Sequence, residues 1–424
     1  MANIVFLLGE YYPNFSATSK CADNVIREIK NKHKVSVICY DDLSNLREHD
    51  NINIIGIATP LMKLKNWINH RYGAKTRGRK SILTFVNFIL RLIGFLGFIF
   101  KKNSVNSSMV RKYYSAIKLC DSKEKIDVII PICFPFEGLI AAYQFKKNNN
   151  TISMIPYLFD PFTDNETLHR FSWLKKLRYK RHEKLEKEIY KYSDKIIIIN
   201  HMLKSPIFMQ NNTFNNKLVV TEHPVLMNPK QSINNDGKSN VVNLTYTGAL
   251  YSNIRRPTYF MEMLKLINSK IGFQMNMYSF GDCEGILNGY QKDFNDKLVL
   301  HGKVPFADAQ LAINNADILI SIGNTIKNQT PSKIFEYISF GKPIVHIYSH
   351  NEDIVVDTLK KYPLSLCIKQ DKNNINENSS RLLMFCKENA GKRIPFKQCM
   401  ELYYDATPKF VANQIDSFIK KKTE

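Results

Sequence analysis

A polar turn followed by a short amphipathic helix, residues 328–345, is the segment whose residue types best suit chemistry. Thr330 is a predicted N-cap, and Pro331 would occupy the first helical turn. The backbone N–H groups of Ser332 and Lys333 would then have no partner within the helix. Free amides at the positive end of a helix dipole bind phosphate well, so this turn predicts a phosphate site.

Glu336 follows one helical turn later, on a face that meets the same end of the helix. Its carboxylate can accept hydrogen bonds from two ribose hydroxyls, which would place a ribose beside the phosphate. The alternative for Glu336 is an ordinary carboxylate on a solvated helix face. Gly341 is expected to end the helix, and Pro343 to begin the next strand.

These residues resemble a motif of a known protein family. The run from Pro331 to Tyr337, followed by Gly341–Pro343, resembles the donor-site signature of GT-B glycosyltransferases, especially family 4. Four more segments resemble that family in the same order: Tyr246–Leu250 with Gly248, Ser279–Asp282 with Gly281, Val299–Pro305 with Lys303 and Val304, and Ala316–Ile320. The resemblance covers roughly residues 241 to 350. It implies a sugar nucleotide as donor and transfer with retention at the anomeric carbon.

The resemblance also implies a basic residue that clamps the donor diphosphate. Arg255 stands at the expected spacing with Arg256 beside it, and the sequence leaves open which of the two is the clamp. The implied catalytic residues are Asp160, Arg255 and Glu336. The implied donor-binding residues are Gly248, Arg255, Arg256, Gly281, Lys303, Val304, Asn328, Thr330, Pro331, Ser332, Lys333 and Glu336.

Three positions depart from the family pattern. Asn328 replaces the first signature glutamate, so the usual carboxylate near the donor sugar is missing. Ala249 stands where a basic residue often follows the loop glycine, which leaves the phosphate charge to the two arginines and Lys333. The segment Phe15–Ser19 replaces a glycine pair, although its small side chains would still admit a sugar phosphate.

On the acceptor side, Asp160 is expected at the carboxyl end of a strand, where ligands of open α/β sheets collect. The alternative is an aspartate that caps a turn before a proline. Glu137 is a second candidate, and Ser16 and Thr18 are expected on the same side. The sequence contains no Asp-x-Asp triplet, so we expect no metal and no cofactor besides the sugar nucleotide.

Short apolar runs alternate with amphipathic segments, which is typical of parallel strands covered by helices. In the N-terminal half the predicted strands are Ile4–Leu8, Val35–Cys39, Val128–Ile132, Ser153–Leu158 and Lys195–Asn200, with a helix over Ser19–Asn31. In the C-terminal half they are Val242–Thr247, Phe273–Ser279, Leu298–His301, Ile318–Ile322 and Pro343–Ile347, with helices over Pro257–Ser269, Ala307–Asn315 and Ser332–Ser339.

We therefore expect an α/β protein of two Rossmann-like domains facing across a cleft. The predicted domains are residues 1–225 on the acceptor side and 241–395 on the donor side, with a linker over 224–240. Residues 396–424 would form a C-terminal helix that crosses back to the first domain.

An insert over residues 71–112 combines basic residues with the apolar run Ile82–Phe100. Arg91 and Asn87 near its middle disfavour a membrane span. A helix lying in the membrane interface fits better, while a core helix pair of the first domain remains an alternative. The net charge of +22 also implies an anionic partner.

No nucleic-acid motif accompanies the charge, so nucleic acid is not expected as a partner. The eight cysteines are scattered singly, which is typical of thiols in a reducing compartment. We expect a cytoplasmic protein, peripheral on the inner face of the cell membrane, that acts on a saccharide or lipid-linked acceptor in surface polysaccharide synthesis. The rival functions are a sugar-nucleotide epimerase of the same fold and a non-catalytic protein that binds sugar nucleotides.

Overall fold

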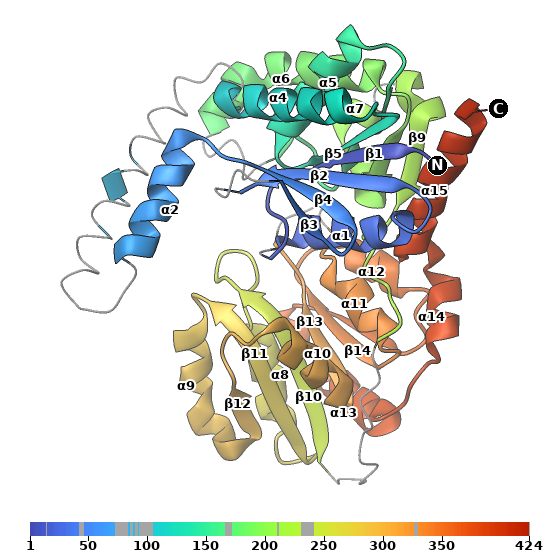
Figure 1. The fold of residues 1–424 in the computed structure, drawn as a ribbon. Helices are drawn as coiled ribbons and strands as arrows, with labels where there is room; N and C mark the ends of the chain where they lie inside the picture. Colours follow the sequence, from blue (N-terminus) through green and yellow to red (C-terminus); the bar gives the residue numbers. More distant parts are fainter. Residues whose placement is uncertain are drawn as a thin grey trace. The chain divides into compact units, whose positions relative to one another are not determined.

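The computed structural model describes residues 1–13, 15–41, 46–72, 84, 88–89, 92, 105–165, 172–209, 212–229, 241–325 and 330–423. It divides into two compact units (Figure 1). The first unit comprises Met1–Pro224 together with Pro408–Glu424, and the second comprises Val225–Thr407. The chain thus enters the second unit once and returns to the first for its last helix.

The first unit is built on a sheet of nine strands in the order β3-β4-β2-β1-β5-β7-β8-β9, with β6 paired to β5. All pairs are parallel except β3 with β4. The strands are β1 Asn3–Leu7, β2 Lys34–Tyr40, β3 Leu46–His49, β4 Ile52–Ile57, β5 Val128–Cys133, β6 Ser153–Met154, β7 Tyr157–Leu158, β8 Ile196–Ile199 and β9 Leu218–Thr221.

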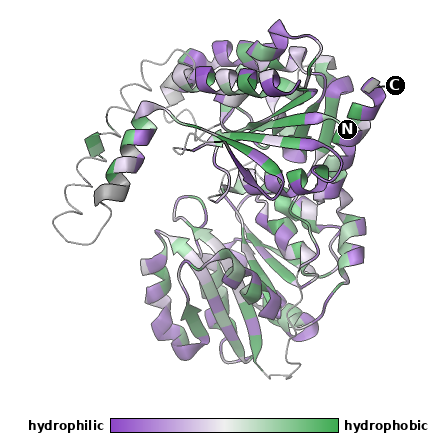
Figure 2. Cartoon of the chain, in the orientation of Figure 1, coloured by the Kyte–Doolittle hydropathy of each residue, from purple (hydrophilic) through white to green (hydrophobic). Residues whose placement is uncertain are grey.

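Helices cover both faces of this sheet, which explains why its central strands are apolar throughout. Helices α4, α5 and α6 pack together on one face, and α1 and α15 contact each other on the other (Figure 1). Figure 2 shows the strands of both units as mainly hydrophobic. The helices are α1 Ala17–Ile29, α2 Pro60–Tyr72, α4 Ser107–Lys123, α5 Phe136–Asn148, α6 Ser172–Tyr192, α7 Pro206–Met209 and α15 Pro408–Thr423.

The second unit has six parallel strands in the order β12-β11-β10-β13-β14-β15. They are β10 Val242–Leu250, β11 Phe273–Gly281, β12 Leu298–Leu300, β13 Ile318–Ile322, β14 Ile344–Tyr348 and β15 Ser365–Lys369. Its helices are α8 Thr258–Ile267, α9 Glu284–Phe294, α10 Phe306–Asn315, α11 Lys333–Ser339, α12 Ile354–Leu359, α13 Ile375–Asn389 and α14 Phe396–Leu402. Two hydrophobic clusters, one under α8 and α13 and one under α11 and α14, form its core.

Two predicted elements differ in the structure. The strand expected over Ser153–Leu158 is interrupted between β6 and β7, where Pro156 has no N–H to donate. The single helix expected over 396–424 is two helices, α14 and α15, separated by a 3-10 turn at Tyr404–Ala406. Pro408 explains the break, because a proline suits the first turn of a new helix and not the interior of a longer one.

The predicted insert over 71–112 falls largely outside the described residues. Helix α2 runs to Tyr72 on one side of it, and α4 begins at Ser107 on the other. Within the described parts of the chain, no helix is both long and apolar enough to span a bilayer.

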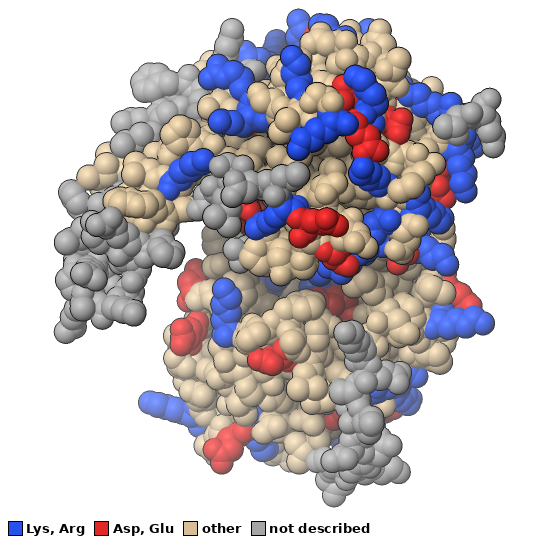
Figure 3. All heavy atoms as spheres, in the orientation of Figure 1, with Lys and Arg blue, Asp and Glu red and all other residues tan. Residues whose placement is uncertain are grey.

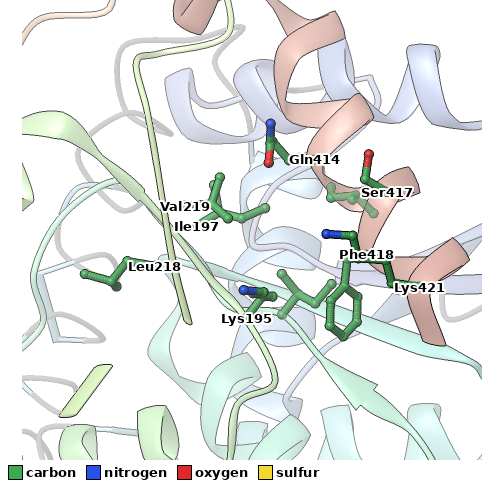
Figure 4. Close-up of a pocket in the computed structure, with 10 residues that line it drawn as sticks. Lys195, Ile197, Leu218, Val219, Gln414, Ser417, Phe418 and Lys421 are labelled. Atoms are coloured by element: carbon green, nitrogen blue, oxygen red, sulfur yellow. The ribbon is translucent and has the colours of Figure 1, made fainter. Parts of the chain in front are cut away.

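An ion-pair network attaches α15 to the first unit. Asp416 lies 3.0 Å from Lys32 Nζ, 3.3 Å from Lys420 Nζ and 3.2 Å from His33 Nε2. His33 Nδ1 accepts a hydrogen bond from the Ala2 N–H, so its Nε2 carries the proton that it donates to Asp416. Beside the network, α15 and the sheet enclose a cavity of about 280 Å³ with Phe418 and Ile197 among its walls (Figure 4).

Asp416→Asn should loosen α15. Burial acts to raise the pKa of Asp416, but hydrogen bonds from Lys32, His33 and Lys420 outweigh it and lower the pKa from 3.8 to about 2. The stabilisation is therefore present above the unfolded-state pKa and is lost as the pH falls toward 2. At neutral pH we expect the substitution to lower the free energy of unfolding by about 1–3 kcal/mol, measured by urea denaturation.

Asp357→Asn is the matched control, because Asp357 pairs with Lys360 and both side chains are largely exposed. Its effect should stay within about 0.5 kcal/mol. Equal stability of the Asp416 and Asp357 variants across the pH range would show that the network does not hold α15.

Candidate donor site

The carboxyl end of β10 presents a guanidinium held by two neighbouring segments. Arg255 Nη2 donates to Asn324 Oδ1 at 2.5 Å, and its Nη1 lies 3.4 Å from the Ala249 carbonyl. Arg255 Nε is buried and has no hydrogen-bond partner among the residues that the structure describes. Because buried donors are normally paired, this N–H is suited to an acceptor supplied by a ligand.

Gly248 lies directly beside this guanidinium. Its φ is +147°, and a Cβ built on it would lie 4.0 Å from Arg255 Nη1 and 3.4 Å from Tyr246 Oη. The Tyr246 hydroxyl in turn donates to the Ala249 carbonyl at 3.0 Å. Burial raises the pKa of Tyr246, with Arg255 opposing the rise, so the phenol stays protonated and remains a donor.

The loop after β13 is bonded to the loop after β10. The Thr325 N–H donates to the Ile254 carbonyl at 2.8 Å, and its hydroxyl donates to the Asn253 carbonyl at 3.0 Å. Both loops follow the carboxyl ends of adjacent parallel strands, where open α/β sheets bind their ligands. The structure therefore gathers Gly248, Arg255 and Asn324 at one edge of the sheet.

Helix α11 is attached to the same strand. Tyr337 is buried, and its hydroxyl accepts a 2.9 Å hydrogen bond from the Thr247 N–H and lies 3.1 Å from the Thr247 hydroxyl. On the same helix, Glu336 contacts Gln310 Nε2 through one oxygen and Lys333 Nζ at 2.8 Å through the other. Its side chain is 18% exposed, so the carboxylate is accessible yet already oriented.

The predicted N-cap is wrong. Helix α11 begins at Lys333, and Ser332 is the capping residue, with helical φ and ψ and no side-chain cap. Thr330 is instead buried, and its hydroxyl finds no hydrogen-bond partner in the segments that the structure describes. A tight turn precedes the helix, in which the Pro331 carbonyl accepts from the Ile334 N–H. Asn328 lies outside the described residues.

The remaining donor-side candidates are either at the surface or part of the strand packing. Arg256 is exposed and donates to the Thr258 hydroxyl, away from the Arg255 contacts. Lys303 is exposed with its ammonium over the Phe280 ring, and Val304 is half-buried. Gly281 has a φ of +128°, and a Cβ there would lie 2.0 Å from the Leu250 carbonyl oxygen. Its role is to let β10 and β11 approach closely.

Asp160 follows β7 and is half-buried. The loop that it begins is held by Glu186, which accepts hydrogen bonds from the backbone N–H groups of Phe162 and Thr163 and from the Tyr190 hydroxyl. Burial raises the pKa of Glu186, while these hydrogen bonds oppose the rise. The loop geometry therefore depends on a buried carboxyl group inside the first unit.

The other acceptor-side candidates have local partners. Glu137 Oε1 accepts the Asn106 N–H at 2.7 Å and so fixes the start of α4. Ser16 is the N-cap of α1 and forms a capping box with Ser19. Thr18 lies half-buried in the first turn of that helix. These contacts give Glu137 and Ser16 structural roles.

Sequence reasoning missed several polar residues at strand ends. Asn324 accepts from Arg255, and His350 Nε2 is 3.0 Å from the Asn324 carbonyl. In the first unit, His201 and His223 are buried after β8 and β9, with their rings 6.3 Å apart. Burial lowers the pKa of His201 to about 4, and burial with the neighbouring His201 lowers that of His223 to about 3, so both are neutral. For His201, its position directly after the predicted strand Lys195–Asn200 was the available signal, whereas β9, which precedes His223, was not predicted.

Gly341→Ala should destabilise the second unit, because Gly341 has a φ of +66° and an added Cβ would lie 2.0 Å from the Ile394 carbonyl oxygen. We expect a loss of about 2–4 kcal/mol, measured by thermal and urea unfolding. Gly289→Ala is the control, since Gly289 lies within α9 and, apart from the helix's own backbone, no described residue comes within 4 Å of its Cβ position. That change should be neutral or stabilising by up to about 1 kcal/mol.

No protein-family model matches the sequence, and no curated protein matches it either. Solved structures do match over the whole chain. The lipopolysaccharide outer core galactosyltransferase WaaB is 12% identical with a TM-score of 0.58, over 99% of both chains. The UDP-forming trehalose-phosphate synthase from Burkholderia xenovorans is 10% identical with a TM-score of 0.61, over 99% of this chain and 100% of that one.

A protein from Listeria monocytogenes described as a putative UDP-N-acetylglucosamine 2-epimerase is 10% identical with a TM-score of 0.56. It matches over 100% of this chain and 97% of its own. Identities this low bear on the fold alone. With two α/β units, each on a mainly parallel sheet, the chain has the two-domain GT-B fold.

Proposed function

We propose that the protein is a glycosyltransferase that uses a sugar nucleotide as donor. The observation that carries this proposal is the Arg255 guanidinium, which is held at the carboxyl edge of the second sheet with its buried Nε unpaired within the described part of the chain. A fixed cation beside an open glycine backbone suits the diphosphate of a sugar nucleotide. The fold supports the same interpretation, since sugar-nucleotide enzymes of several kinds share it.

In this proposal the diphosphate contacts Arg255, Lys333 and the Ser332 N–H, and the ribose hydroxyls contact Glu336. Departure of the nucleoside diphosphate builds negative charge on the β-phosphate oxygens. A guanidinium fixed beforehand stabilises that charge without reorganising, and more strongly than it stabilises the bound donor. Arginine, lysine and backbone amides supply the neutralisation, so the proposed reaction needs no metal. Retention at the anomeric carbon is part of the proposal.

Arg255→Ala and Glu336→Ala should each weaken donor binding or turnover at least tenfold, on the order of the loss of one charge-assisted hydrogen bond. Calorimetric titration with a panel of nucleoside diphosphates and their sugars measures this and identifies the base. Arg256→Ala should change affinity less than Arg255→Ala, because Arg256 is exposed and bonded to Thr258. Full activity in both the Arg255 and Glu336 variants would remove the assignment.

Arg381→Ala is the matched control for lost charge. Arg381 lies on α13, where it donates to Asn378 Oδ1 and to the Cys367 carbonyl. A loss of nucleotide affinity in this variant equal to that of Arg255→Ala would point to general electrostatics instead of a specific contact.

The proposed acceptor is a saccharide carried on a lipid, reached at the membrane surface. WaaB, which shares the fold, is described as a lipopolysaccharide outer core galactosyltransferase. In this chain, α2 exposes Leu61, Leu64 and Trp67 at helical spacing, with exposed fractions of 43%, 46% and 52%. Figure 3 shows Lys and Arg side chains spread over the first unit. Exposed apolar residues on a basic protein are typical of interfacial helices.

Replacing Leu61, Leu64 and Trp67 together by serine should reduce flotation with vesicles containing anionic lipid by roughly tenfold or more, since each large apolar side chain contributes about 1.5–3 kcal/mol when buried. Deletion of residues 73–104 should reduce it further. The control replaces Leu311 and Met384, which are equally exposed on the second unit. Flotation unchanged in the α2 variant, or reduced equally in the control, would argue against the membrane role.

Sugar-nucleotide epimerisation remains the second candidate. The observation in its favour is the pair of buried neutral imidazoles, His201 and His223, the latter beside Glu222 in sequence. Groups of this kind can move a proton at a sugar carbon. Incubating the donor without any acceptor separates the two functions, because only an epimerase changes the donor sugar and leaves its nucleotide attached.

A further inference from the structure

His346 is a fully buried histidine on β14 whose two ring nitrogens both face polar atoms. Its Nδ1 lies 2.9 Å from Ser321 Oγ on the adjacent strand β13. Its Nε2 lies 3.4 Å from Asp353 Oδ1, at the start of α12, and makes no hydrogen bond within the described residues. It costs free energy to bury an imidazole with polar atoms on both sides inside an otherwise apolar strand. We therefore expect this side chain to have a role in the structure or the function.

Asp353 is itself held in place. As the N-cap of α12, its Oδ1 accepts the Val355 N–H at 2.9 Å. Burial acts to raise the pKa of Asp353, but the adjacent His346 imidazole and the hydrogen bond from the Val355 N–H outweigh it, and the pKa is lowered. The carboxylate is thus ionised and immobile, and the imidazole stands between it and the Ser321 hydroxyl.

The side chains of His346 and Asp353 lie directly against the turn that follows β13. A Cβ built on Gly323 would lie 2.7 Å from Asp353 Oδ2 and 3.3 Å from His346 Cε1. The Gly323 N–H also donates to the Ile347 carbonyl at 2.8 Å. Glycine is required here because the turn rests directly on the two side chains.

The next residue of that turn is Asn324, which holds Arg255 Nη2 at 2.5 Å through its amide oxygen. His350 Nε2 contacts the carbonyl of the same residue at 3.0 Å. A continuous set of contacts therefore runs from the buried pair, through Gly323 and Asn324, to the guanidinium. A shift of the His346 and Asp353 side chains would displace the Asn324 amide and release the guanidinium.

The geometry points to His346 as a positioning residue: with Ser321 and Asp353 it fixes the Gly323–Asn324 turn and thereby aims the Arg255 guanidinium at the donor diphosphate. The diphosphate in this inference rests on the proposed function, whereas the placement of Arg255 does not. His346 is buried and acts through Asn324, so it is not itself a catalytic residue.

The first test needs no ligand. In protein labelled with ¹⁵N-arginine, the Arg255 Nε–H resonance is assigned by its loss in Arg255→Lys. Ser321→Ala and His346→Gln should shift or broaden that resonance and leave the other arginine signals in place. Ser379→Ala, which removes a buried serine hydroxyl on α13, is the matched control and should not move it. An unmoved Arg255 signal in the folded Ser321 and His346 variants would overturn the inference.

The second test is a double-mutant cycle on affinity for UDP. His346→Gln should weaken UDP binding by roughly threefold to thirtyfold in the wild-type background and by less than about twofold once Arg255 is replaced by alanine. The same loss in both backgrounds would show that His346 does not act through Arg255. If UDP and the other nucleoside diphosphates fail to bind the wild type while the Arg255 resonance still responds, the proposed function fails and the positioning role stands.

Discussion

The hydrogen bond between the Arg255 guanidinium and the Asn324 amide fixes a single charge at the edge of the second sheet. Arg255 follows β10 and Asn324 follows β13, which are adjacent and parallel, so the two residues emerge at the same edge. A free arginine side chain loses about 2 kcal/mol of rotamer entropy when a ligand immobilises it. The bond to Asn324 removes part of that loss before any ligand arrives, and so makes the guanidinium a better anion receptor than an exposed arginine such as Arg256.

This arrangement depends on close approaches of the backbone that only glycine permits. At Gly281 the β11 end lies against the Leu250 carbonyl, and at Gly341 the turn into β14 lies against the Ile394 carbonyl. A side chain at either place would push apart the segments that carry the polar residues. These two glycines thus act on packing around the site, while Gly248, with a φ of +147°, lies next to the guanidinium itself.

The sequence predicts the strands better than the contacts between them. Strand β13, Ile318–Ile322, is predicted in full because its apolar run is bounded by polar residues on both sides. Asn324 and His346 are missed because their importance comes from neighbours more than twenty residues away in the chain. The cap at Thr330 is predicted from residue type, yet the hydroxyl is buried and the helix begins later, which local preference cannot anticipate.

The net charge of the whole protein and the local charge at the candidate donor site act in different ways. A net charge of +22 acts over a Debye length and is screened by salt, so it suits attraction to an anionic surface but not recognition of one ligand. At the donor edge the described cations are few, and each is constrained: Arg255 by Asn324, and Lys333 by Glu336 at 2.8 Å. The Lys333–Glu336 pair limits the local positive charge and keeps the carboxylate oriented without neutralising Arg255. In the proposed function, selectivity for a diphosphate with a ribose attached would come from the placement of one guanidinium and one carboxylate, and the excess charge elsewhere would bring the protein to its acceptor.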